Sequence, residues 1–295
     1  MSRNAEAEEE EHKVAESHVA VPLVVDDERY TLTRRNPMEF DEVDPYFFDE
    51  SYSVAAMTGF LVWDGCWVLM KYLRKESVAS TLKGKRVLEL GSGTGIVGLY
   101  AALLGAHSLC TDIAPVVEGS VWENVERLHR QTVAKGIKVD EGVVDSSKKA
   151  WPLAQLVGSR GGSAAGCPLD WRESLDMLDK LPSKKPRLGE EDVVNSLEYD
   201  IILASETIWL SELVEAFVAT TAALLTKGPK GKKCILSFRD RTKTQTSEVF
   251  ASGEKLIKAF ADRGCTMEQV YYDTADEIPG LFVFVFEIFA TDTSS

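Results

Sequence analysis

The sequence predicts an α/β protein with a doubly wound, seven-stranded, Rossmann-like sheet and an antiparallel C-terminal edge. Short apolar runs alternate with amphipathic segments along most of the chain, a pattern typical of strand–helix units. The stretch 87–98 shows one such unit, because an apolar run ends in a glycine-rich turn that opens an apolar helical segment. The last two apolar runs, 267–272 and 281–289, are separated by the turn pair Pro279-Gly280, which predicts an antiparallel strand pair.

The remaining elements follow from the same patterns. Short continuous apolar runs predict buried parallel strands, and apolar residues spaced three and four apart predict the helices between them. Gly264 predicts the end of the last helix. The third strand has two candidates, 165–171 and 138–144. In chain order we expect helix 65–73, strand 85–90, helix 96–104, strand 108–112, helix 116–135, the third strand, strand 199–206, helix 213–225, strand 232–238 and helix 247–263.

Composition divides the 295 residues into three regions. Residues 1–18 form a glutamate-rich tail that we expect to be disordered. Residues 19–50 form an N-terminal extension with one strand-like run at 19–25. Residues 51–291 form the sheet domain, and its stretch of about 145–198 is interpreted as an insertion because glycine, serine and charged residues interrupt the regular pattern.

Composition also limits the class of protein. No apolar run reaches the roughly 18 residues that a membrane span needs, and the N-terminus lacks the basic start and apolar core of a secretory signal. The five cysteines are scattered and include no C-x-x-C pair. We therefore expect structural thiols in a reducing compartment rather than a metal site. The expected location is the cytoplasm, with the nucleus as an alternative.

The formal net charge is −14, whereas a nucleic-acid-binding protein would normally show a basic face. An acidic protein suits a partner with a basic surface, such as a lysine-rich protein. The alternative, that the negative charge only keeps the protein soluble, explains the same value equally well. The charge therefore disfavours nucleic acid as a partner without identifying another.

The glycine-rich turn after the first strand carries the strongest functional signal. Gly91, Gly93 and Gly95 remove side chains where the backbone must turn and approach a ligand. The third glycine comes one position too early for the dinucleotide fingerprint G-x-G-x-x-G, which disfavours a nicotinamide dehydrogenase. Glu89 precedes the glycines, and Asp112 lies about 20 residues beyond them, where an acid holds the ribose hydroxyls of a nucleoside cofactor. An ordinary glycine-rich strand–helix turn is the alternative.

The segments 62–65, Val-Trp-Asp-Gly, and 82–95, which ends in Glu-Leu-Gly-Ser-Gly-Thr-Gly, resemble the family 16, or METTL21-like, class I protein methyltransferases. The resemblance implies a methyltransferase sheet that binds S-adenosyl-L-methionine. It also implies methylation of a protein side-chain nitrogen, lysine in most branches of the family and histidine in one. The implied substrates are non-histone proteins of the chaperone or translation-factor class.

The same resemblance assigns three aromatic or acidic residues to the cofactor. It implies that Trp63 lies beside the cofactor, and the alternative for this residue is a tryptophan of the core. It also implies that Asp170 and Trp171 flank the adenine. An aromatic face stacks on a purine, and an acid accepts a hydrogen bond from its amino group.

The stretch 205–209, Ser-Glu-Thr-Ile-Trp, resembles the family's motif after the fourth strand, in which an aromatic residue follows an acid by three positions. The resemblance adds Ser205 to the cofactor-binding set and implies catalytic roles for Glu206 and Trp209. Because the methyl acceptor must be an unprotonated amine, we expect Glu206 to accept one of its N–H bonds. We expect Trp209 to enclose the aliphatic stem of the target and to favour the developing ammonium. An acid that caps the next helix is the alternative for Glu206.

Two features of this motif leave the target and the activity open. Trp209 replaces the family's usual tyrosine, and the sequence Ser-Glu-Thr-Ile at 205–208 is more similar to that of the histidine-methylating branch. A protein-histidine methyltransferase and a catalytically weak cofactor-binding module are therefore kept as alternatives, as is a methyltransferase for RNA or a small molecule. Arg239 and Arg241, after the fifth strand, are expected either to contact substrate or to form surface ion pairs.

Overall fold

The computed structural model describes residues 18–35, 58–137, 154–171, 199–226, 230–243, 248–274 and 281–291. The predicted tail up to residue 17, the candidate strand at 138–144, most of the predicted insertion and the Pro279-Gly280 turn lie outside these described residues. Among the described helices, none combines the length and apolar character needed to cross a membrane. No three His, Cys, Asp or Glu side chains within the described ranges are grouped to hold a metal ion.

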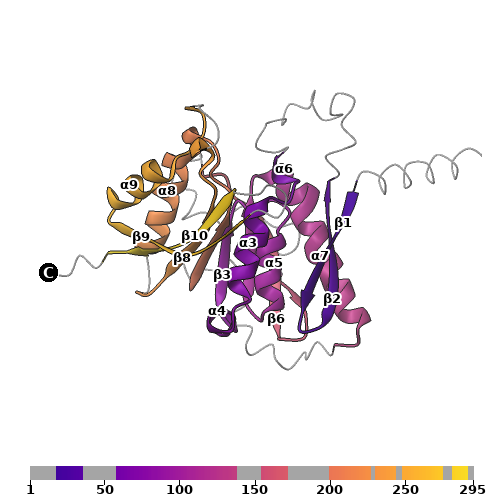
Figure 1. Cartoon of the computed structure of the whole chain (residues 1–295). Helices are drawn as coiled ribbons and strands as arrows, with labels where there is room; N and C mark the ends of the chain where they lie inside the picture. The colour runs from indigo at the N-terminus through magenta and orange to yellow at the C-terminus, as the bar shows by residue number, and fades with distance from the viewer. Residues whose placement is uncertain are drawn as a thin grey trace, which may run out of the picture.

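The described residues form one main sheet of eight strands: β3 (Arg86–Leu90), β4 (His107–Asp112), β5 (Gln155–Val157), β6 (Gly162–Pro168), β7 (Ile201–Ser205), β8 (Lys233–Phe238), β9 (Cys265–Thr274) and β10 (Phe282–Ala290). Their order is β5-β6-β4-β3-β7-β8-β10-β9 (Figure 1). The strands from β6 to β8 in this order run parallel, whereas β10 and β9 follow as an antiparallel pair. The predicted doubly wound sheet with an antiparallel C-terminal edge is confirmed.

Two details of the sheet differ from the prediction. The eighth strand, β5, pairs antiparallel with β6 at the opposite edge, and its three residues are too few to leave a recognisable apolar run. The third strand is β6, so the candidate 165–171 lies at the correct place but begins three residues late. Gly162 and Ser163 open β6, and these residue types are poor strand signals.

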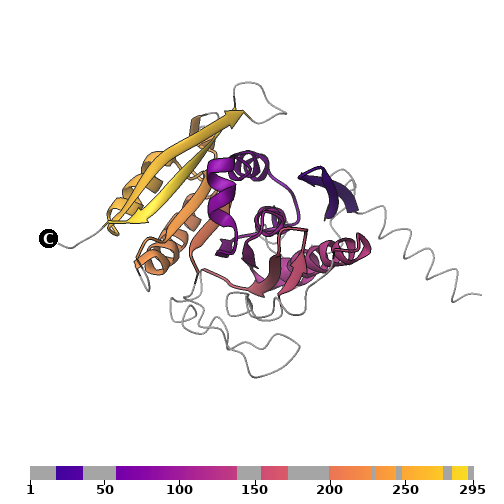
Figure 2. The same cartoon turned by 90° about the horizontal axis from the view of Figure 1, so that it is seen from below.

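Helices cover both faces of the sheet (Figure 2). The strands contribute alternate residues to two apolar cores, so that Val87 faces one core and Leu88 the other. Because the central strands are buried on both faces, β7 appears in the sequence as a continuous apolar run, and β3 appears so apart from the buried charged residues Arg86 and Glu89. The first face carries α3 (Asp64–Leu73), α4 (Glu76–Leu82), α5 (Ile96–Leu103) and α7 (Trp122–Ala134), and the second carries α8 (Ser211–Thr226) and α9 (Gly253–Ala261).

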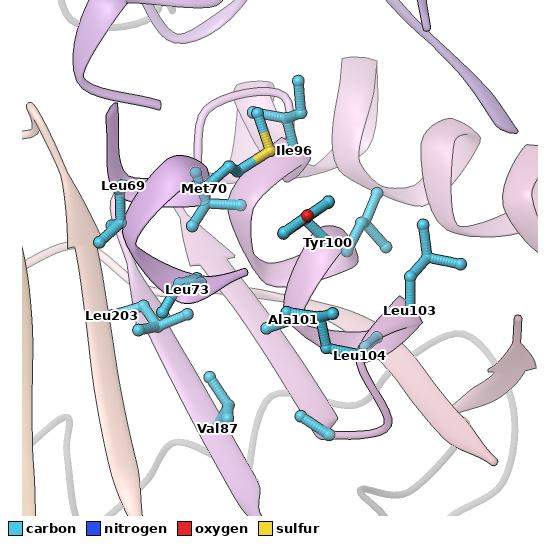
Figure 3. Close-up of a cluster of buried hydrophobic side chains, with 14 of the residues drawn as sticks. Leu69, Met70, Leu73, Val87, Ile96, Tyr100, Ala101, Leu103, Leu104 and Leu203 are labelled. Atoms are coloured by element: carbon cyan, nitrogen blue, oxygen red, sulfur yellow. The ribbon is translucent and has the colours of Figure 1, made fainter. Parts of the chain in front are cut away.

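The first core fixes α3 against the sheet. Figure 3 shows Leu69 and Leu73 of α3 beside Val87 and Leu203, which belong to β3 and β7. All four side chains are completely buried, and full burial of one such side chain stabilises the fold by roughly 1.5–3 kcal/mol. This packing also fixes the segment that leads into α3, which lies at the carboxyl end of the sheet.

The helix predicted at 116–135 consists of three parts. It begins as α6 (Ala114–Val116), continues as the π-helical turn η2 (Val117–Val121) and ends as α7. Gly119 lies in the π-helical turn, and a Cβ atom there would be 2.9 Å from the ring of Phe60. A single π-helical turn inside an α-helix is often found at a functional site, and here it makes room for the segment before α3.

The N-terminal extension forms a hairpin of two strands, β1 (His18–Val25) and β2 (Glu28–Arg35). The sequence predicted only the first, because charged residues at both ends of β2 obscure its apolar positions. Two side chains of α7 pair with the backbone of β2: Gln131 with Thr31, and Asn124 with Thr33. Asn124 also donates to the carbonyl oxygen of Thr94 at 3.0 Å, so α7 connects the hairpin to the glycine turn.

Candidate active site

A cleft lies at the carboxyl ends of β3, β4 and β7, where open α/β sheets bind their ligands. Of the eleven residues predicted to form the site, nine line this cleft and two, Glu89 and Gly95, do not. The nine come from five separate stretches of the described chain, so the fold brings together residues that lie far apart in the sequence. They are Trp63, Gly91, Gly93, Asp112, Asp170, Trp171, Ser205, Glu206 and Trp209.

The glycine turn needs glycine for two separate reasons. Gly91, Gly93 and Gly95 have φ angles of +64°, +54° and +78°, which side chains disfavour. In addition, a Cβ atom on Gly91 would lie 2.7 Å from the Trp171 ring, and one on Gly93 would lie 2.9 Å from the carbonyl oxygen of Gly59. The first two glycines therefore allow cleft walls to approach, whereas Gly95 serves the backbone turn that opens α5.

Glu89 lies beneath the glycine turn rather than in the cleft. Its Oε2 accepts the N–H of Gly98 in the first turn of α5 at 3.0 Å, and only 1% of the residue is exposed. Burial raises the pKa of Glu89 to about 8. Gly98 has no room for a side chain, because a Cβ atom there would lie 2.5 Å from Glu89 Oε2. The predicted direct contact of Glu89 with a cofactor is thus replaced by support of the turn from below.

Asp112 joins the end of β4 to the glycine turn. Its Oδ2 accepts the N–H of Gly93 and its Oδ1 the N–H of Ile113, both at 2.8 Å. Burial raises the pKa of Asp112 to about 6, and the charge of nearby Asp170 acts in the same direction. The two acids thus lie at one end of the cleft, where the sequence predicted contacts to ribose and adenine.

Three buried polar atoms of the cleft residues have no hydrogen-bond partner among the described residues. They are Ser92 Oγ, Trp171 Nε1 and Thr207 Oγ1. Buried polar groups are nearly always hydrogen-bonded, so such atoms around one cleft fit a polar ligand. The Trp171 ring is held edge-on to Phe217 at a centroid distance of 5.4 Å and is therefore fixed in place.

Glu206 connects three elements at the other end of the cleft. It follows β7 with a φ angle of +50°, unusual for a residue with a side chain. Its Oε2 accepts the N–H of Gly65 in the first turn of α3 at 2.7 Å, and its Oε1 pairs with Arg241 at 2.5 Å. Glu206 therefore caps α3 rather than the helix that follows it, α8. Gly65 is required by this contact, because a Cβ atom there would lie 2.7 Å from that of Glu206.

The side chains of Glu206 and Trp209 both line the cleft, as predicted. Glu206 and Trp209 both precede the helix, because α8 begins only at Ser211. Trp63 lines the same cleft, and its indole donates to the carbonyl oxygen of Thr58 at 3.0 Å. Two aromatic side chains and one acid thus surround this end.

Arg239 and Arg241 are both ion-paired. Arg239 pairs with Asp64 of α3 at 3.3 Å, and Arg241 pairs with Glu206 in a buried position. Of the two alternatives expected for these arginines, the surface ion pair is wrong for Arg241, which is 8% exposed and forms a buried pair. A charged residue shortly after a strand is usually exposed, and the residues around Arg241 in the sequence do not indicate that Glu206 is its buried partner.

Several cleft residues were not predicted. Thr58, Cys66, Ser92 and Thr207 line the cleft although none of them was assigned a role in the site from the sequence. Ser92 lies between Gly91 and Gly93, and Thr207 follows Glu206. These positions within the two motifs are the sequence signal that could have predicted them. Cys66 was interpreted as a structural thiol, and it is buried with its pKa raised to about 12 by burial.

Comparison with known proteins decides the family. A family described as lysine methyltransferase matches residues 49–146. Over 221 residues the chain is 32% identical to the protein N-lysine methyltransferase METTL21A of Danio rerio, covering 74% of this chain and 73% of the relative. The chain belongs to the METTL21-like lysine methyltransferase family.

Other relatives of this methyltransferase match over shorter stretches. It is 39% identical over 162 residues to the protein-lysine methyltransferase METTL21E of Bos taurus, with 55% of this chain and 42% of the relative covered. It is 42% identical over 64 residues to EEF1A lysine methyltransferase 3 of Xenopus tropicalis, with 22% and 27% covered. The chain is thus a protein N-methyltransferase of the lysine-methylating class. This assignment rests on its sequence relatives.

Proposed function

We propose that this methyltransferase transfers a methyl group from S-adenosyl-L-methionine to the side-chain nitrogen of a lysine in a non-histone protein. One observation carries the proposal: a single cleft has acids and a tryptophan at one end, and an acid with two aromatic side chains at the other. The first end suits a nucleoside, and the second suits an amine on an aliphatic stem.

The cofactor would be held by residues of the first end. Asp112 presents carboxylate oxygens that retain free lone pairs for ribose hydroxyls. Asp170 and the ring of Trp171 would accept the adenine, and Ser92 and Thr207 offer hydroxyl groups that need partners. Gly91 and Gly93 line the same cleft, and the lack of a side chain at Gly91 lets Trp171 and Thr207 approach the turn. This donor set fits the cofactor that the family implies.

The residues of the second end would act on the target amine. When bound, the cofactor supplies an electrophilic methyl group, so that the amine nitrogen forms the N–C bond as the C–S bond breaks and its electron pair goes to sulfur. Glu206 would accept an N–H bond from the amine and aim its lone pair. Trp63 and Trp209 would enclose the stem and favour the ammonium that develops. Positioning of this kind supplies most of the acceleration in such reactions.

The proposed partner is a protein with a basic surface around the target lysine. The net charge of −14 suits such a surface. One relative is named for its action on EEF1A, and we take this translation factor as the first candidate substrate. The proposed location is the cytoplasm, with the nucleus as the alternative.

Label transfer tests the proposal. The purified protein is incubated with S-adenosyl-L-methionine that carries a labelled methyl group and with purified EEF1A, and the label is located by mass spectrometry of peptides. We expect it on a lysine side chain. Label on histidine would favour the histidine-methylating alternative, which the sequence Ser-Glu-Thr-Ile at 205–208 supports. Calorimetric binding of the cofactor without transfer to any protein of a cell extract would favour the non-catalytic module.

A further inference from the structure

The ion pair of Glu206 with Arg241 lies at the floor of the cleft. Arg241 opens the short 3-10 turn η5 (Arg241–Lys243) after β8, and its Nη2 lies 2.5 Å from Glu206 Oε1. Its guanidinium carbon also lies 5.5 Å from the centre of the Trp63 ring. Arg241 therefore contacts both the proposed acceptor of the target amine and the ring of Trp63, which lines the same cleft.

The charges that face Glu206 balance one another. From α3 come Asp64 and the thiol of Cys66, which burial keeps uncharged, and from the segment after β8 come Arg239 and Arg241. Two carboxylates thus meet two guanidinium groups. Burial raises the pKa of Glu206, and the charge of Arg241 opposes that rise. A buried carboxylate without such a partner would either take up a proton or attract another cation.

We propose that Arg241 is a positioning residue for methyl transfer, which keeps Glu206 ionised while cancelling its charge. The inference rests on the proposed function. A target lysine can then donate an N–H bond to Glu206 without being held as an ammonium, whose nitrogen has no lone pair for the methyl carbon. In the balanced step the neutral amine forms the N–C bond, the C–S electron pair leaves on sulfur, and the methylammonium product later loses its proton to solvent.

The pH dependence of transfer distinguishes this role from a purely structural one. With EEF1A as the probe substrate, single-turnover rates at saturating substrate report ionisations within the complex. For Arg241→Gln we expect the acid limb of the rate profile to move upward by about 1–3 pH units, the range that one close charge produces. Arg241→Lys should restore the wild-type limb, because it returns the charge.

A double variant supplies the matched control. Glu206→Gln with Arg241→Gln removes both charges and leaves two amides that can still hydrogen-bond, so its acid limb should return close to the wild-type pH although the rate stays low. A structural role would instead lower the rate of Arg241→Gln equally at every pH. That result, or an equally shifted limb in the double variant, would overturn the proposal. If Arg241→Gln does not fold, Arg239→Gln removes the more distant positive charge and should shift the limb the same way by less.

A measurement without protein substrate separates this inference from the proposed function. The carboxyl carbon of Glu206 is titrated by NMR in protein labelled with ¹³C-glutamate, and Glu206→Gln assigns its signal. We expect its pKa to be higher in Arg241→Gln than in the wild type. An unchanged pKa would overturn the inference even if EEF1A is methylated. If EEF1A is not methylated, only the proposed substrate fails and the NMR result decides the role of Arg241.

Discussion

Asp112 and Gly93 are joined by a hydrogen bond of 2.8 Å, in which the carboxylate of Asp112 accepts the backbone N–H of the glycine turn. This bond connects the end of β4 to the turn after β3. One side chain therefore shapes the glycine turn and also faces the cleft. Loss of its charge should affect the cofactor site without removing any part of the apolar core.

We expect Asp112→Ala to lower the affinity for S-adenosyl-L-methionine by about 10- to 100-fold, since a hydrogen bond to a charged group is worth roughly 1.5–3 kcal/mol. Isothermal titration calorimetry measures this directly. Asp262→Ala, which removes an exposed carboxylate paired with Lys258, is the matched control and should bind as the wild type does. Unchanged affinity in Asp112→Ala would show that the cofactor does not use this carboxylate.

The fold could be predicted largely because its strands are buried on both faces. Strands β3 and β7 have all five residues buried, and such strands are rich in apolar residues, which the sequence shows at both places. β5 and β2 were missed because one is too short and the other is charged at its ends. The start of α9 was placed too early, since Ser252 caps it by accepting from Lys255 N–H, and the preceding residues are not helical.

The site could be predicted as far as its residues lie in local motifs. Gly91, Gly93 and Asp112 carry their signal in spacing alone, and all three line the cleft. The buried pair of Glu206 and Arg241 joins positions 35 residues apart, and without the fold no pattern indicates such a pair. The placement of Glu89 beneath the turn likewise depends on how closely Gly98 approaches it.

Glu89 should make stability depend on pH. Its pKa is raised to about 8 in the folded protein, so the folded state holds a proton that the unfolded chain has released. This contribution is complete below the ordinary pKa of glutamate and is lost as the pH rises towards 8. We expect the free energy of unfolding to fall by a few kcal/mol between pH 5 and pH 8, because holding one extra proton changes it by about 1.4 kcal/mol for each pH unit.

Urea denaturation at the two pH values measures this effect. Glu89→Gln keeps an oxygen for the N–H of Gly98 but cannot ionise, so the fall in stability should be much smaller in this variant. The exposed Glu126→Gln should keep the wild-type fall. A Glu89→Gln protein with the full wild-type dependence would contradict the assignment of the proton to Glu89.

Glu206→Gln tests the acid at the second end better than Glu206→Ala does. Removing the whole side chain leaves Arg241 buried without its partner, which costs about 3–5 kcal/mol of stability. Glutamine keeps the side-chain volume and one acceptor oxygen, which can accept from Gly65 or from Arg241 but not from both. Part of the loss of stability therefore remains, whereas the cofactor affinity should be retained. We expect turnover to fall by about 10²–10⁴, as for other positioned polar groups. Single-turnover methylation of EEF1A measures the turnover, and calorimetry measures the cofactor affinity. Full activity in Glu206→Gln would show that the acid only supports the fold.

Trp209 should act mainly on substrate binding. Trp209→Ala removes an aromatic wall of the cleft, so we expect a higher KM for the protein substrate with cofactor affinity unchanged. Trp209→Tyr keeps an aromatic face and should be tolerated. Steady-state kinetics with EEF1A separate KM from kcat. Equal losses in both variants would argue against an aromatic wall at this position.

The most direct test of the two-ended cleft is a crystal structure of the protein with S-adenosylhomocysteine, the demethylated form of the cofactor. The account predicts ribose hydroxyls on the Asp112 carboxylate, the adenine against Trp171, and the sulfur directed towards Glu206 and Trp209. A product bound elsewhere, or bound in this cleft with its adenine at the Glu206 end, would contradict the account.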